Sequence, residues 1–226
     1  MNLQKIQQYI SEYKEHLKKA RELEHAFKWE SLKVFQENWD LEAADFGKMY
    51  DACFQSTTTR RLWKGDNFFP KEMMLKFIEL SPDFVRNMFR DLFDEKKDIE
   101  NRIPRFQFCC DSLLAEYKSK NPLSIENNHF HQENHVISMY LSFRFPENYT
   151  LFEYPFFKKT MENLGSTNAP TPFDFGRFFK VVRTLNSFLK KDEEVLILQK
   201  KKLNPQVHFM GSTLLSVNDF YHFIAR

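Results

Sequence analysis

Apolar residues recur at alternating spacings of three and four over the first part of the chain. The series comprises Leu3, Ile6, Ile10, Tyr13, Leu17 and Ala20, and charged or polar residues fill most of the gaps. A stripe of this period is typical of an amphipathic helix, which we expect over residues 2–26. Because the stripe lasts only about three heptads, packing on the chain's own domain is favoured over a coiled-coil seam.

The same period predicts further helices, and local signals set their bounds. We expect them over residues 27–38, 41–54, 71–80, 82–93, 103–118, 155–164, 173–189, 193–203 and 217–225. Asp40 and Asp192 are placed to cap two of these helices at their N-termini. Pro70 and Pro82 occupy helix-start positions, and Gly165 suits the position after a helix C-terminus.

Two segments interrupt this pattern. Residues 119–132 are polar and Asn-rich, which makes them the best candidate for an internal boundary or simply a long loop. Residues 136–145 suit a small strand by their β-branched and aromatic content, but the spacing of Ile137, Tyr140 and Leu141 favours a helix. We therefore predict a mainly α fold, a compact multi-helix domain, with residues 1–226 as a single helical module.

Composition favours a packed helical protein over a β-protein or a disordered chain. The 226 residues include 26 Phe and only 5 Gly. Tight β-hairpins need Gly or Asn at positive-φ positions, and disordered segments are poor in aromatic residues. The net charge of +2 offers no overall attraction for polyanions, so nucleic-acid binding would depend on a local patch.

The cysteines and the absence of long apolar runs predict the compartment. Cys53, Cys109 and Cys110 cannot all pair within the chain, and neighbouring cysteines form only a strained disulfide. No secretory segment follows Met1, and no run approaches the roughly 18 apolar residues of a membrane span. We expect free thiols in a reducing, cytoplasmic setting.

No complete catalytic motif occurs in the sequence. GxxxxGK[ST], GxGxxG and GxSxG are all absent. His129, His131 and His135 lie close together around Glu133, but the Glu of an HExxH site is not at its required position. We therefore expect a solvated segment rather than a metal site, and no catalytic residue or cofactor in this chain. A hydrolase or nuclease built on these histidines is the least favoured alternative. Residues 200–202, all Lys, are read as a solvated helix end.

One stretch interleaves cations with aromatic rings. It contains Arg60, Arg61, Lys64 and Lys71 around Trp63, Phe68 and Phe69, with only Asp66 as an opposing charge. Cations contact phosphates and exposed rings stack on bases, so we predict that the four cations bind DNA and that the three rings stack on bases. Trp29 and Trp39 are further stacking candidates, because two converging rings can sandwich a flipped base. Core packing is the favoured alternative for these two.

Several stretches together resemble a known family. They are Lys28-Trp29 with Phe35–Asp40, then Asn67–Leu75, then Val85–Glu95, and then Ile137–Leu141 with Arg144–Pro146. In order and spacing, and over about residues 1–226, the chain resembles the N-terminal region of bacterial McrB-type AAA+ restriction proteins. The motor's Walker motifs are absent from these residues.

The resemblance implies a variable DNA-recognition module that works with a nucleotide-hydrolysing motor and a nuclease. We therefore expect the specificity module of a modification-dependent restriction or anti-phage defence system, with reading of a modified base as one option. Its expected partners are DNA, an AAA+ motor in cis or in trans, and a nuclease subunit. The alternative is a protein-interaction adaptor that docks a motor or nuclease through the first helix and a Phe-rich surface.

Overall fold

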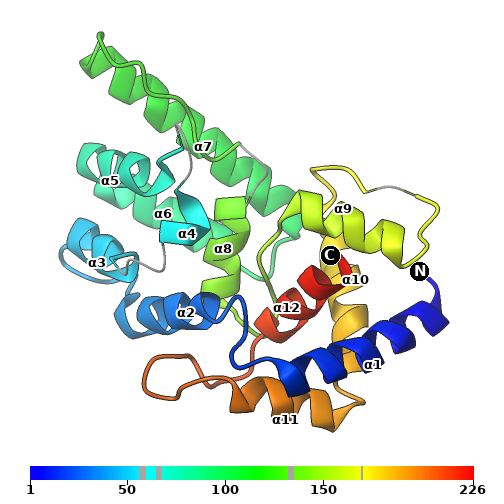
Figure 1. The fold of residues 1–226 in the computed structure, drawn as a ribbon. Coiled ribbons are helices and arrows are strands. Elements are labelled where there is room, and N and C mark those ends of the chain that lie inside the picture. Colours follow the sequence, from blue (N-terminus) through cyan, green and yellow to red (C-terminus); the bar gives the residue numbers. More distant parts are fainter. Residues whose placement is uncertain (56–59, 65–67, 132–134, 169) are drawn as a thin grey trace.

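The computed structural model describes residues 1–55, 60–64, 68–131, 135–168 and 170–226. Within these ranges the chain forms twelve α-helices and no strand, which confirms the mainly α prediction (Figure 1). The helices are α1 (Leu3–Lys19), α2 (Phe27–Asn38), α3 (Phe46–Cys53), α4 (Arg60–Trp63), α5 (Pro70–Leu80), α6 (Pro82–Leu92), α7 (Ile99–Lys120), α8 (His135–Arg144), α9 (Tyr154–Asn163), α10 (Phe175–Leu189), α11 (Glu193–Lys201) and α12 (Leu215–Ile224).

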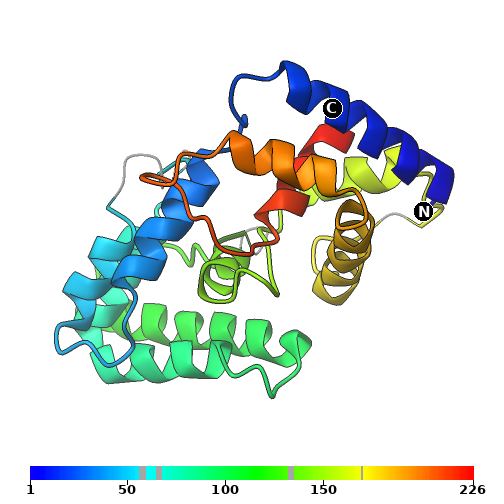
Figure 2. The same ribbon diagram turned by 90° about the horizontal axis from the view of Figure 1, so that it is seen from below.

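The helices form two groups that share one core. In the first group α2 packs on α3 and α8, α3 packs on α5 and α6, and α5, α6 and α7 pack on one another. The second group contains α9–α12 together with α1, which lies against α10, α11 and α12 (Figures 1 and 2). Contacts between α7 and α10 join the groups, and the buried apolar side chains form one cluster from Ile6 to Ile224. The first helix is therefore covered by the end of the chain.

Helix α1 is formed by the apolar stripe of the sequence. Ile6, Ile10, Tyr13 and Leu17 are buried, and the Asn2 side chain caps the helix by accepting from backbone N–H groups of the first turn. The predicted extension to residue 26 is wrong. Ala20 leaves the helical region with φ −65° and ψ 140°, and the chain then turns to carry Leu23 into the core before α2 begins.

The helix predicted to start after Asp40 begins five residues later in the structure. Asp45 is the N-cap of α3, and its Oδ1 accepts a hydrogen bond from Lys48 N at 2.9 Å. The Asp40 side chain instead accepts from Glu42 N at 2.9 Å. Arg86 donates to the carbonyl oxygens of Leu41 and Ala43, which ties this segment to α6 in a non-helical form.

Two other elements correct or decide the sequence expectations. The segment 136–145, for which the sequence left strand and helix open, forms helix α8. Its pattern was ambiguous because residues 136–143 are all buried, and a fully buried helix has no polar face to reveal its period.

Helix α7 starts earlier than expected and contains Pro104. It extends beyond the neighbouring helices, and the chain after Lys120 returns along it (Figure 1). Gln107 donates to Phe130 O at 3.1 Å there, so the described part of 119–132 lies against α7.

The other local signals are confirmed. Pro70 and Pro82 stand in the first turns of α5 and α6. Asp192 accepts from Val195 N as the N-cap of α11, and Gly165 has φ +70° after α9. The three cysteines are free thiols. Among the described residues, no helix combines the length and apolar character that crossing a membrane requires.

Candidate functional site

The predicted cationic segment contains a short helix that the sequence pattern did not predict. In and beside α4, Arg60, Arg61 and Lys64 are exposed. None of the three has a carboxylate partner among the residues that the structure describes; Asp66, expected to oppose them, lies outside those residues. The Arg61 guanidinium lies 5.5 Å from the centre of the Phe27 ring. This surface is therefore able to offer three cations to an anionic partner.

Lys71 does not share this freedom. Its Nζ lies 2.6 Å from Asp51 Oδ1 and donates to Phe54 O at 3.1 Å. Its side chain is only 12% exposed. Because its charge is already paired with Asp51, Lys71 is not one of the cations that this structure leaves free for a phosphate, as the sequence prediction required.

Two of the tryptophans are core residues and not exposed stacking surfaces. Trp29 and Trp63 are 2% and 4% exposed, so neither ring presents the exposed face that the predicted stacking requires. Trp39 is half-buried and packs on Phe35 with ring centres 4.8 Å apart and on Phe89 at 5.1 Å, so its faces are also occupied. The physical reason is the same in each case, since burying a large indole removes much apolar surface from water.

The two phenylalanines differ from each other. Phe68 is half-buried and packs edge-on against His129, with ring centres 5.7 Å apart. Phe69 is 37% exposed, and the Lys64 ammonium lies 5.8 Å from its ring centre. Of the predicted stacking residues, Phe69 is the one with an accessible ring beside a cation.

The histidines of the former metal candidate turn to separate partners. His129 is buried, His131 lies 2.9 Å from Asp111 Oδ2, and His135 Nε2 contacts Leu62 O at 2.5 Å. Glu133 lies outside the described residues. Within those residues, no group of three or more His, Cys, Asp or Glu is arranged to hold a metal ion.

A buried charged cluster joins α2 to α12 and was not predicted. Lys28 is 1% exposed, and its Nζ lies 2.9 Å from Glu153 Oε2 and 2.7 Å from Asn218 Oδ1. Glu153 Oε2 also accepts from Tyr221 OH at 2.9 Å and lies 2.6 Å from His222 Nε2. Burial alone would raise the pKa of Glu153, but the Lys28 charge and the His222 hydrogen bond hold it well below its ordinary value.

A second carboxylate extends this cluster toward α1 and α11. Asp219 Oδ2 accepts from Tyr13 OH at 2.5 Å, and His25 Nδ1 lies 3.4 Å from Asp219 Oδ1. Gln199 Nε2 donates to Tyr13 OH at 2.6 Å. Burial lowers the pKa of His222 from its ordinary value, and the hydrogen bond to Glu153 opposes this shift. The cluster connects helices from both ends of the chain. Most of its polar atoms pair with one another, His222 Nδ1 and Gln199 Oε1 being buried without a partner, which fits a structural joint better than a reaction centre.

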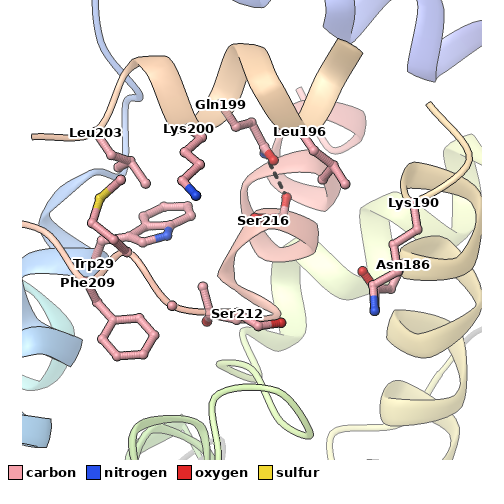
Figure 3. A pocket seen from close by; sticks show the side chains of 13 residues that line it. Trp29, Asn186, Lys190, Leu196, Gln199, Lys200, Leu203, Phe209, Ser212 and Ser216 are labelled. Atoms are coloured by element: carbon pink, nitrogen blue, oxygen red, sulfur yellow. Dashed lines mark hydrogen bonds between the residues drawn. The ribbon is translucent and has the colours of Figure 1, made fainter. Parts of the chain in front are cut away.

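A cavity of about 330 Å³ lies between α11, α12, the end of α10 and the loop before α12. Figure 3 shows Trp29 and Phe209 on one side of this space, and Asn186 and Lys190 on the other. Gln199 and Lys200 reach it from α11, and Ser212 and Ser216 come from the loop and α12. Lys200, expected to be a solvated helix end, is exposed but lies at the wall of this cavity.

The polar residues of the buried cluster left one sequence signal. Asn218, Asp219 and His222 interrupt an otherwise apolar terminal segment and are all buried. The cavity had no such signal, because its lining is drawn from four separate parts of the chain.

Comparison of the chain with protein-family models, curated proteins and solved structures gives no match.

Proposed function

We propose that this chain is a DNA-recognition module that contacts phosphates through Arg60, Arg61 and Lys64. The observation that carries the proposal is the exposure of these three cations without a carboxylate partner among the described residues. Phe69 supplies an accessible ring next to Lys64. Backbone phosphates would be held by the cations, and an unpaired or extruded base would stack on the ring.

The resemblance to McrB-type N-terminal regions gives this surface its biological setting. A specificity module needs a packed core and a binding face but no reaction chemistry of its own. The motor and the nuclease of such a system would be supplied in cis or in trans, and the setting would be modification-dependent restriction or anti-phage defence. Plain, methylated and hydroxymethylated DNA are therefore the ligands to compare.

Binding is tested by fluorescence anisotropy with these three duplexes over a series of salt concentrations. We expect R60A/K64A to weaken binding to all of them alike and to reduce the salt dependence by roughly two counterions, because each lost phosphate contact removes about one. This pair leaves the contact between Arg61 and Phe27 intact. The matched control is K180A/R183A, which removes the same two residue types from exposed positions on α10.

The proposal fails if the wild-type chain binds none of the duplexes at low salt. It also fails if the control pair weakens binding as much as R60A/K64A, because the contact would then be non-specific surface charge. Selective loss of binding to one modified duplex on F69A would assign base reading to that ring.

A second candidate, the adaptor, is supported by a different surface. The apolar face of α1 is buried by its own chain, so it is not the docking element expected from the sequence. Leu123 and Ile125, in the loop that follows α7, are 97% and 93% exposed. If L123S/I125S leaves DNA binding unchanged but abolishes association with a motor or nuclease subunit, the chain is also an adaptor.

A further inference from the structure

The cavity of Figure 3 carries positive charge without a compensating carboxylate. Lys190 and Lys200 are the ionisable residues of its lining. Neither forms an ion pair within the part of the chain that the structure describes. The hollow beside Lys71 differs, because Asp51 and Glu72 line it as well. The cavity therefore favours an anionic occupant over a neutral or cationic one.

Free hydrogen-bonding groups surround the same space. The side chains of Asn186, Ser212 and Ser216 line the cavity and make no hydrogen bond to other described residues. In Figure 3, Asn186 and Lys190 lie together on α10, while Ser212 comes from the loop between them and Phe209. An amide and two hydroxyls beside ammonium groups are donors suited to phosphate or carboxylate oxygens.

Gln199 lines the cavity, but its free acceptor is buried behind the wall. This side chain is 2% exposed, and its Nε2 donates to Tyr13 OH and to Ser216 O at 2.6 and 3.0 Å. Because Ser216 O can only accept, the amide orientation is fixed and Oε1 is left without a partner. That oxygen has less than 1 Å² of accessible surface, so it is buried behind the cavity wall and does not face an occupant of the cavity.

The opposite wall is flat and apolar. Its accessible ring is that of the half-buried Phe209, since Trp29 behind it is only 2% exposed; Phe209 N donates to Trp29 O at 3.1 Å, which ties the loop to α2. Gly211 allows this arrangement, because a Cβ there would lie only 2.5 Å from Phe209 Cζ. Aromatic rings next to lysines suit a ligand with a planar part and an anionic part.

We propose that this cavity binds a small organic anion that carries a flat ring, of the chemical class of a nucleoside monophosphate. The anionic group is held by Lys190 with the neighbouring Asn186 amide and the hydroxyl groups, and the ring packs against Phe209 on the opposite wall. The volume of about 330 Å³ lies at the lower end of the range of about 300–1,000 Å³ for small-molecule sites. The site is separate from the surface proposed to contact DNA.

Isothermal titration of the full chain with the four ribonucleoside monophosphates tests the proposal. The matching nucleosides and inorganic phosphate are titrated as partial ligands. We expect at least one monophosphate to bind more tightly than either of its parts. The variant K190A/K200A should weaken that binding by about tenfold or more, since the loss of one hydrogen bond to a charged group already accounts for about that factor. The control K180A/K201A removes two exposed lysines outside the cavity and should bind normally.

A second variant keeps the test independent of folding defects. S212D places a carboxylate at an exposed position of the lining, so it should abolish anion binding while the melting temperature stays near that of the wild type. The proposal is overturned if no monophosphate binds the folded chain at millimolar concentration. It is also overturned if phosphate alone binds as tightly as the monophosphates, or if S212D and K190A/K200A bind like the wild type.

Discussion

The Lys28 ammonium lies 2.9 Å from the Glu153 carboxylate in a site where Lys28 is 1% exposed. Lys28 belongs to α2, and Glu153 immediately precedes α9, so this ion pair joins the two groups of helices. Asn218 and His222 of α12 contact the same ammonium group at 2.7 and 3.1 Å. Buried ions are stable only when their partners satisfy them, which makes each member of this cluster dependent on the others.

Removal of one partner should therefore destabilise the fold strongly. We expect K28M to lower the free energy of unfolding by about 3 kcal/mol or more, because it leaves the Glu153 carboxylate buried without its cation. The double variant K28M/E153Q should lose less than the sum of the single losses. Urea denaturation of the wild type, K28M, E153Q and K28M/E153Q measures this coupling. Additive losses would show that the two residues act separately.

The pH dependence of the same pair has a defined sign. The pKa of Glu153 is held well below its ordinary value of 4.5, so the unfolded chain takes up a proton at higher pH than the folded chain does. The stabilisation from Glu153 is complete above about pH 4.5 and is lost as the pH falls toward the folded-state pKa. The difference in unfolding free energy between wild type and E153Q should shrink accordingly below pH 4.5. A difference that is constant down to pH 3 would contradict this assignment.

Local chemistry explains which parts of the fold were predictable. The helix-boundary signals depend only on residues a few positions away in the sequence. The structure confirms three of them: the N-cap Asp192, the helix-start Pro82 and the positive-φ Gly165. Asp40 and Asp45 are both competent helix caps, and the choice between them depends on Arg86, which is distant in sequence. A prediction from neighbouring residues alone therefore cannot choose between the two caps.

The candidate site was less predictable for the same reason. Helix α4 has four residues, too few to show a period that would reveal the inward direction of Trp63. Lys71 looked free because Asp51 stands on a different helix and before the intervening loop. The exposure of Arg60 and Lys64 was the part accessible from sequence, since cations without an apolar pattern tend to remain solvated.

Tyr50 and Tyr140 provide a test of a neutral buried pair. Their hydroxyl oxygens lie 2.6 Å apart, and both side chains are essentially buried. Y140F leaves the Tyr50 hydroxyl without its partner and should cost about 1–3 kcal/mol. Y50F/Y140F removes both hydroxyls and should be closer to the wild type than the sum of the single losses. Thermal denaturation of the wild type, Y50F, Y140F and Y50F/Y140F measures these losses. Fully additive losses in the double variant would exclude coupling between the two hydroxyl groups.

Gly165 offers a prediction about the backbone alone. It has φ +70° after α9, where the preceding Leu164 O accepts from Asn2 N at 2.8 Å, so its conformation positions the start of α1. A Cβ there would meet no atom closer than 3.8 Å, and the cost of G165A is therefore conformational, about 1 kcal/mol. G47A is the matched control. Gly47 is the second residue of α3 with its nearest neighbour at 3.6 Å, so Ala should fit and stabilise by up to about 0.5 kcal/mol. Chemical denaturation should thus give changes of opposite sign, and equal changes in the two variants would show that backbone conformation is not the cause.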